Sequence, residues 1–288
     1  MECIKQVAIE VFKGSETANP IINPVRVDID VTQKCNSNCG FCFSKEYRKG
    51  IYYDQWITKD ELERLLYQLA SIGVKSIRYC GGGEPLLHPQ IEEILALPHK
   101  YNLKLSLITN GDYLNHAIAS LILRYVDKLH WSVNAATNQL RQKLHNQKGF
   151  PNSLSEIMKY VKFITESRKD MTIDTNRPAV WASYLILPEN IDEIIPAANK
   201  LKQLELDSVS FRPVYHGLNN KWSSSNIEKL KRVLFEVKRL DNAPHFQIFT
   251  PKRDILESPN LNPNLFFKQC ISKNVRTVIE PSAEGLII

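Results

Sequence analysis

Three cysteines lie close together in a short polar loop, Cys35-Asn36-Ser37-Asn38-Cys39-Gly40-Phe41-Cys42, with the spacing C-x3-C-x2-C. Thiolates at such spacing usually hold a metal. A structural zinc site needs four ligands, but the next cysteine is Cys80 and the next histidine is His88. A [4Fe–4S] cluster held by Cys35, Cys39 and Cys42 fits better, because one iron is then free to bind a small molecule.

A repeating pattern of strands and helices must position this loop. It predicts six βα units, hence a parallel sheet with helices outside. Right-handed crossovers would curl such a sheet into a partial (βα)6 TIM-like barrel of the α/β class. The expected strands are 25–31, 75–80, 103–109, 128–134, 180–187 and 208–214. The expected helices are 58–73, 88–99, 114–124, 139–144, 153–168, 191–204 and 226–240.

Short polar motifs follow the first four expected strands, where ligands of parallel α/β folds bind. Gly81-Gly82-Gly83-Glu84-Pro85 follows the second strand, Thr109-Asn110-Gly111 follows the third, and Ser132-Val133-Asn134-Ala135 ends the fourth. Glycines let the backbone approach a ligand, and a carboxylate can accept hydrogen bonds from an ammonium group. The alternative for the glycine triplet is an ordinary tight turn.

Five of the six strands carry polar residues on one face and apolar residues on the other, at a period of two. Helices should cover the apolar faces, so the polar faces are expected to line a lumen that holds a polar ligand. The alternative is a filled barrel in which these residues pair only with one another. The polar sets are Arg26/Asp28/Asp30, Ser76/Arg78/Cys80, Lys104/Ser106/Asn110, His130/Ser132/Asn134 and Ser208/Ser210/Arg212.

The cysteine loop and the Gly-Gly-Glu motif together resemble the radical S-adenosylmethionine (radical SAM) family over about residues 25–215. The resemblance implies that the open iron binds S-adenosylmethionine and that Phe41 lies near its adenine. Gly82, Gly83 and Glu84 would contact the methionine amino group. Asn110 and Asn134 are candidates near the ribose, and Ser132 and Arg141 are candidates for the methionine carboxylate. Many relatives have Asp and Gly where this chain has Asn134 and Ala135, and Arg141 could instead be a solvated helix residue.

The end of the chain has a different pattern, with a possible strand at 246–249, an irregular stretch, the lone Cys270, and strands at 275–280 and 285–288. This resembles the start of a SPASM or Twitch extension, which implies that Cys270 is a ligand of an auxiliary iron–sulfur cluster and that the sequence is truncated. An ordinary buried thiol is the alternative. We therefore divide the chain into an N-terminal extension (1–24), a radical SAM barrel (25–240) and a C-terminal extension (241–288).

The composition excludes several classes of protein. The chain has 288 residues, 43% hydrophobic and 24% charged, and no apolar run long enough for a membrane span, so we expect a globular protein. A signal-peptide pattern is missing and the cysteines are too few for a disulfide scaffold, which favours the cytoplasm. The net charge of +6 is spread out. Nucleic acid is therefore an unlikely partner.

The resemblance to the radical SAM family implies an enzyme that cleaves S-adenosylmethionine reductively to a 5′-deoxyadenosyl radical, which abstracts hydrogen from a peptide or a small molecule. The resemblance implies an electron donor such as flavodoxin or ferredoxin. Three residues at the end of the sixth strand could contact substrate: Arg212, which would suit an anionic group, Tyr215 and His216. The alternative is an ordinary surface or structural role, which we favour for His216. The alternatives are a structural zinc protein without enzymatic activity and a radical SAM enzyme that modifies tRNA.

Overall fold

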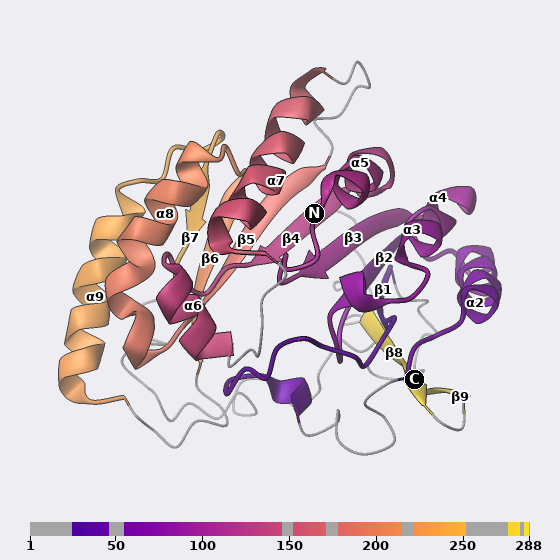
Figure 1. The fold of residues 1–288 in the computed structure, drawn as a ribbon, viewed down its shortest axis with the longest axis horizontal. Coiled ribbons are helices and arrows are strands. Elements are labelled where there is room, and N and C mark those ends of the chain that lie inside the picture. The colour runs from indigo at the N-terminus through magenta and orange to yellow at the C-terminus, as the bar shows by residue number, and fades with distance from the viewer. Residues whose placement is uncertain are drawn as a thin grey trace, which may run out of the picture.

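The computed structural model describes residues 25–45, 55–145, 152–170, 178–214 and 222–251, together with the backbone of 276–282 and 285–287. In these residues the strands form one open sheet in the order β7-β6-β5-β4-β3-β2-β1-β8-β9, parallel except for the β8–β9 pair (Figure 1). The strands are β1 (Arg26–Asp30), β2 (Ser76–Cys80), β3 (Lys104–Thr109), β4 (Lys128–Ser132), β5 (Ala179–Ile186), β6 (Ser208–Pro213), β7 (Gln247–Phe249), β8 (Arg276–Ser282) and β9 (Gly285–Ile287).

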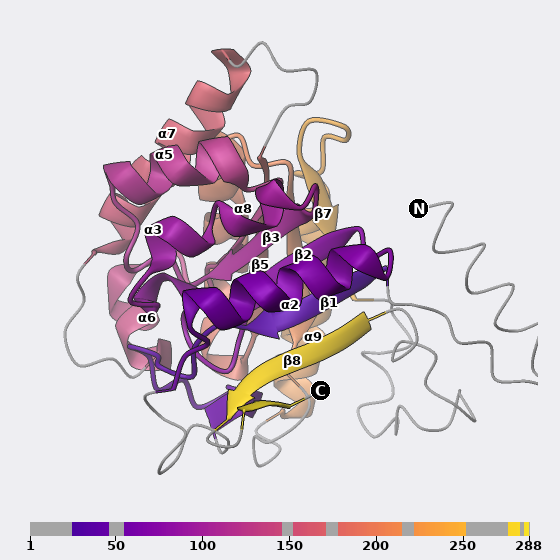
Figure 2. The same ribbon diagram turned by 90° about the vertical axis from the view of Figure 1, so that its right-hand side faces the viewer.

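The helices between these strands cover the outer face of the sheet (Figures 1 and 2). They are α2 (Lys59–Ser71), α3 (Ile91–Ile94), α4 (Leu97–Lys100), α5 (His116–Tyr125), α6 (Asn138–His145), α7 (Leu154–Ser167), α8 (Ile194–Gln203) and α9 (Ser224–Lys238). Short 3-10 helices lie at Phe43–Lys45, Pro85–Leu87, Arg168–Asp170 and Pro188–Glu193. None of the helices in the described residues has both the length and the apolar character that a membrane crossing requires.

The alternating pattern explains the core. The apolar residues of each strand face the helices and are almost fully buried, for example Ile29 in β1, Tyr79 in β2, Leu107 in β3 and Trp131 in β4. The polar residues of the same strands lie in rows on the inner face, because parallel pairing aligns Asp28 with Arg78 and Arg78 with Ser106. The predicted α/β partial barrel is therefore confirmed, with the sheet left open.

One expected helix is wrong. The segment 88–99 forms two separate single turns, α3 and α4, instead of one helix. Pro98 explains the break, because a proline has no N–H to donate to the fourth residue before it and its ring clashes with that carbonyl. Pro98 instead lies in the first turn of α4, where an N–H is not needed.

The C-terminal strands add to the barrel sheet on both sides. β7 pairs with β6, and β8 pairs with β1 in parallel, with Arg26 in register with Arg276 (Figure 2). β1 therefore has a hydrogen-bonded neighbour on each side. The expected strands at 246–249, 275–280 and 285–288 are thus present, while Cys270 lies outside the described residues.

Candidate functional site

The cysteine loop leaves the carboxyl end of β1 and is held by one contact within the loop and one backbone contact to α6. Cys35, Cys39 and Cys42 are not joined in disulfides, and each is partly exposed. The Ser37 amide donates to the Cys35 sulfur at 3.4 Å, and the Asn38 amide donates to the His145 carbonyl at 2.9 Å. The loop is therefore anchored to the end of α6 while its three sulfurs stay accessible.

The donor chemistry of the loop fits an iron–sulfur cluster. Within the described residues, no three His, Cys, Asp or Glu side chains converge closely enough to hold one metal ion. A cubane cluster does not require that convergence, because each thiolate binds a different iron. The accessible, unbridged thiols of Cys35, Cys39 and Cys42 therefore suit a cluster of several irons.

The glycine–glutamate loop packs directly against the residues that lead into the cysteine loop. The Gly83 amide donates to the Thr32 carbonyl at 2.9 Å, and the Glu84 amide donates to the Lys34 carbonyl at 2.8 Å. A Cβ atom on Gly83 would lie 2.1 Å from the Lys34 carbonyl oxygen, and one on Gly82 would lie 1.7 Å from the Gln33 side chain. Contact between the two loops therefore needs Gly83, because a Cβ there would meet backbone atoms, whereas a Cβ on Gly82 would require the Gln33 side chain to move. Contact of both glycines with S-adenosylmethionine stays a prediction.

Glu84 is buried between the ends of β2 and β3. Its carboxylate accepts hydrogen bonds from the Leu86 amide at 3.2 Å, the Thr109 hydroxyl at 2.6 Å and the Asn110 amide at 2.8 Å. Burial raises the pKa of the Glu84 carboxyl to about 7, and the hydrogen bonds lower it only in part. The sequence predicts that Glu84 contacts an ammonium group. Such a group, on approaching Glu84, would favour the charged form of the carboxyl.

Asn110 connects the end of β3 to the cysteine loop. Its side-chain amide donates to the Asn36 side-chain oxygen at 2.9 Å, and its own side-chain oxygen accepts from the Asp112 amide at 2.9 Å. Asn36 in turn donates to the Asp112 carboxylate at 2.6 Å. The three residues form a polar network that joins two strand ends.

Arg141 belongs to the same network and is not a solvated helix residue. Its side chain is 1% exposed and forms an ion pair with Asp112, whose side chain is fully buried. Neither Asp112 nor Asn36 was predicted as a site residue from the sequence. Asp112 directly follows the Thr109-Asn110-Gly111 motif, so a charged residue after a strand-end motif was the available signal. The contact of Arg141 with the methionine carboxylate stays a prediction.

The remaining predicted residues have varied surroundings. The Asn134 side-chain oxygen accepts from the Leu185 amide at 2.8 Å, so this residue, which is 2% exposed, links β4 to β5. Ser132 lies in register with Ser183 and is partly buried. The Phe41 ring meets the His145 ring edge-on, with centroids 6.1 Å apart. Contacts of Phe41, Ser132 and Asn134 with a cofactor stay predictions.

Other candidates are separate from this network. The Cys80 thiol donates to the Asp30 carboxylate at 3.6 Å, and burial raises the pKa of that thiol far above its usual range, so Cys80 is a protonated thiol inside the sheet. Arg212 lies at the end of β6 and is exposed. Tyr215, His216 and Cys270 lie outside the described residues.

The open parallel sheet and the three-cysteine loop define a partial α/β barrel whose polar loops gather at the carboxyl ends of its strands. The sequence matches the radical SAM superfamily over residues 29–222, more than half of the chain, so the chain belongs to that superfamily. The resemblance seen in the sequence is thereby confirmed.

Two curated proteins with known activities are similar to this chain in sequence. A GTP 3′,8-cyclase of Clostridium perfringens is 27% identical over 222 residues, which cover 74% of this chain and 64% of the relative. An S-adenosylmethionine-dependent nucleotide dehydratase of Flammeovirga pacifica is 24% identical over 195 residues, or 59% of this chain and 67% of the relative. This chain thus spans less than two thirds of the length of the cyclase.

Solved structures support the same fold. Streptococcus suis SuiB bound to its precursor peptide SuiA has a TM-score of 0.65 at 17% identity, covering 97% of this chain and 61% of SuiB. The structure of anSMEcpe with bound AdoMet has a TM-score of 0.57 at 16% identity, covering 78% of this chain and 63% of that one. At such identities the likeness concerns the fold alone.

Proposed function

We propose that this chain is a radical SAM enzyme that binds a [4Fe–4S] cluster at Cys35, Cys39 and Cys42 and S-adenosylmethionine beside it. The cluster supplies one electron that cleaves S-adenosylmethionine to methionine and a 5′-deoxyadenosyl radical, which abstracts a hydrogen atom from a peptide or small-molecule substrate. The supporting observation is the packing of three elements: the glycine–glutamate loop and the end of β3 both bond directly to the cysteine loop or to the residues that lead into it.

The chain's own residues have distinct tasks in this proposal. Glu84 receives the methionine ammonium group through charge-assisted hydrogen bonds, while Thr109 and the Asn110 amide hold its carboxylate in place. Asn36, Asn110 and Asp112 fix the orientation of the cysteine loop. Gly82 and Gly83 permit the close packing that brings Glu84 to this loop.

Partners and location complete the proposal. A one-electron donor such as flavodoxin or ferredoxin would reduce the cluster, and the reducing cytoplasm would keep the thiols unbridged. If Cys270 holds part of an auxiliary cluster, substitution of the loop cysteines should remove only the four iron atoms of the first cluster. The iron of the auxiliary cluster should remain bound.

The test is anaerobic reconstitution with iron and sulfide, followed by addition of S-adenosylmethionine and dithionite and measurement of 5′-deoxyadenosine. The wild type should be brown and form 5′-deoxyadenosine, and Cys39→Ala should not form it. Cys80→Ala is the matched control, because Cys80 is a cysteine outside the loop, and it should keep both iron and activity. A colourless wild type that carries zinc and forms no 5′-deoxyadenosine would contradict the proposal and favour a structural zinc site.

A further inference from the structure

A cavity of about 250 Å³ lies on the inner face of the sheet, at the end opposite the cysteine loop. It is lined by cationic and aromatic side chains from four neighbouring strands and from β5, chiefly Arg26, Arg78, Lys104, Lys128, His130 and Trp181. Arg26, Lys104 and Lys128 each begin a strand. Because strands rise about 3.3 Å per residue, the five residues of β1 alone separate this cavity from the carboxyl ends by roughly 13 Å.

Strand register explains why the charges converge. Parallel pairing aligns Arg26 with Ser76 and Ser76 with Lys104 in one row, and Arg78 with Ser106 and Ser106 with Lys128 in the next. The residues of one row point to the same face, so two rows bring four cationic side chains together. Serines between them leave room for a ligand.

The acidic residues nearby do not neutralise this cluster. The buried Asp28 carboxylate is shared by two guanidinium groups, Arg26 at 3.5 Å and Arg78. Asp127 also lines the cavity and accepts a hydrogen bond from the Leu105 amide at 2.8 Å. In the part of the chain that the structure describes, neither Lys104 nor Lys128 forms an ion pair, and the Lys128 ammonium group lies 4.9 Å from the centroid of the Trp181 ring. The cavity therefore keeps a positive surplus.

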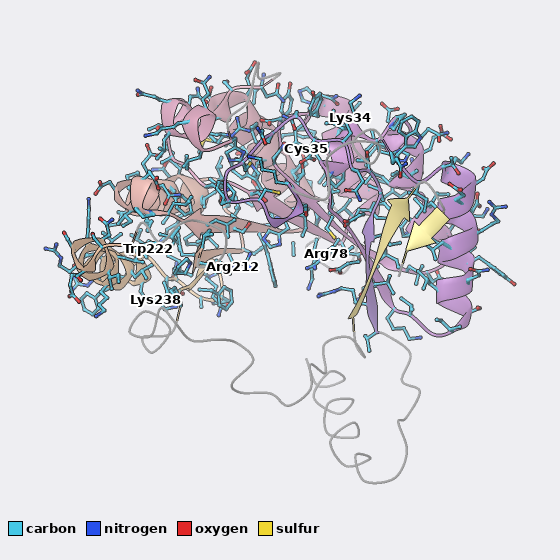
Figure 3. All side chains as sticks on the ribbon, turned by 90° about the horizontal axis from the view of Figure 1, so that it is seen from below. Lys34, Cys35, Arg78, Arg212, Trp222 and Lys238 are labelled. Carbon is cyan, nitrogen blue, oxygen red and sulfur yellow. The ribbon has the colours of Figure 1, made fainter. Side chains whose placement is uncertain are left out.

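His130 adds a hydrogen-bonding group at the inner side of the cavity. Its Nε2 atom is buried and has no hydrogen-bond partner among the described residues. Burial, together with the positive charges of Arg212 and Arg78, lowers the pKa of the imidazole to about 4, so the ring is neutral near pH 7. Figure 3 labels Arg78 and Arg212, from β2 and β6, on either side of the middle of the curved sheet.

We propose that this cavity binds the phosphate group of a small phosphorylated substrate. Guanidinium groups bind phosphate oxygens in pairs and ammonium groups act as point charges, so the combination of Arg26, Arg78, Lys104 and Lys128 suits a multiply charged anion better than a single peptide carboxylate. The inference rests on the proposed function, because it makes the cavity the anchor that holds a substrate inside the barrel while the part to be oxidised points toward the cysteine loop.

The test is calorimetric titration of the reconstituted full chain with inorganic pyrophosphate. We expect saturable binding with one site per chain, weakened about tenfold or more by the double variant Lys104→Gln/Lys128→Gln. Both lysines are exposed at the ends of their strands, so the variant should fold. Lys159→Gln, an exposed lysine on α7, is the matched control and should bind as the wild type does.

Two results would overturn this inference. One is that pyrophosphate fails to bind or binds the double variant equally well. The other is that a glutamate-rich peptide displaces pyrophosphate and binds more tightly, which would assign the cavity to a peptide. Formation of 5′-deoxyadenosine, measured on the same samples, separates the two proposals. Its absence alongside intact pyrophosphate binding would refute the radical SAM activity and the substrate role, whereas its presence without pyrophosphate binding would refute only the phosphate site.

Discussion

At the carboxyl ends of β1–β3, polar side chains are buried or partly buried and bonded to one another: Asn36, Asn110 and Asp112 form one network, and Arg141 completes it. At the amino ends of β3 and β4, Lys104 and Lys128 are exposed and without ion-pair partners among the described residues. The network at the carboxyl ends fixes the geometry of the loops but requires the charges of Asp112 and Arg141 to be buried. The lysines at the amino ends keep their charges available to bind an anion. We therefore expect stability to depend on the carboxyl end and anion binding on the amino end.

The largest effect should come from Asp112→Ala. Removing this carboxylate leaves the Arg141 guanidinium buried without its partner, which typically destabilises a protein by about 3–5 kcal/mol. Urea unfolding monitored by circular dichroism would measure the change. Glu205→Gln is the control, because its exposed ion pair with Lys169 should contribute less than about 1 kcal/mol. If both variants lose the same free energy of unfolding, the buried pair at the carboxyl end does not contribute more to stability than an exposed one, and the expected contrast between the two ends is wrong.

The next effect concerns pH. Burial raises the pKa of Glu84 to about 7 in the folded chain, above the roughly 4.3 of an unfolded chain, so folding favours the protonated form. Its contribution is fully present below pH 4.3 and is lost as the pH rises through 7, on the order of 3 kcal/mol in total. Glu84→Gln should lack this decline when unfolding is measured from pH 5 to pH 8. Identical pH profiles for both proteins would show that the Glu84 carboxyl does not titrate in this range.

A smaller effect is expected for Gly83→Ala. The added methyl group would lie 2.1 Å from the Lys34 carbonyl oxygen, so the two loops must separate, at about 1–3 kcal/mol. Iron content after reconstitution should fall as well, since the cysteine loop loses its neighbour. Gly40→Ala is the matched control in the same region, because a Cβ there meets nothing within 4 Å. A Gly83→Ala protein with full stability and full iron content would argue against the required contact.

The smallest effect should be that of Lys104→Gln/Lys128→Gln on stability. Neither ammonium group forms an ion pair with a residue that the structure describes, and their removal relieves repulsion within the cationic cavity. The free energy of unfolding should therefore change by less than about 1 kcal/mol. Thermal unfolding at low ionic strength is the measurement. A loss as large as that of Asp112→Ala would mean that these lysines support the fold, and the contrast between the two ends would then be wrong.

The sequence predicted the family and the fold well where the signal lies within one short stretch of residues. The C-x3-C-x2-C spacing, the glycine–glutamate motif and the period-two strands each occupy one short stretch, and they led to the correct family and fold. It was not informative where a partner is distant. Arg141 and Asp112 are on different elements, so a buried ion pair could not be distinguished from a solvated arginine. Likewise, the convergence of Arg26, Arg78, Lys104 and Lys128 requires the register of four strands, which the pattern of each strand alone does not determine.

The pairing of β8 with β1 has a consequence for how the chain folds. β1 acquires this neighbour from the opposite end of the sequence, and closing so long a connection is entropically slow. Until β8 arrives, β1 is an edge strand whose free amides and carbonyls can pair with another molecule. The strand that carries the cysteine loop is thus an open edge during synthesis, and a partner that shields this edge would raise the yield of folded protein.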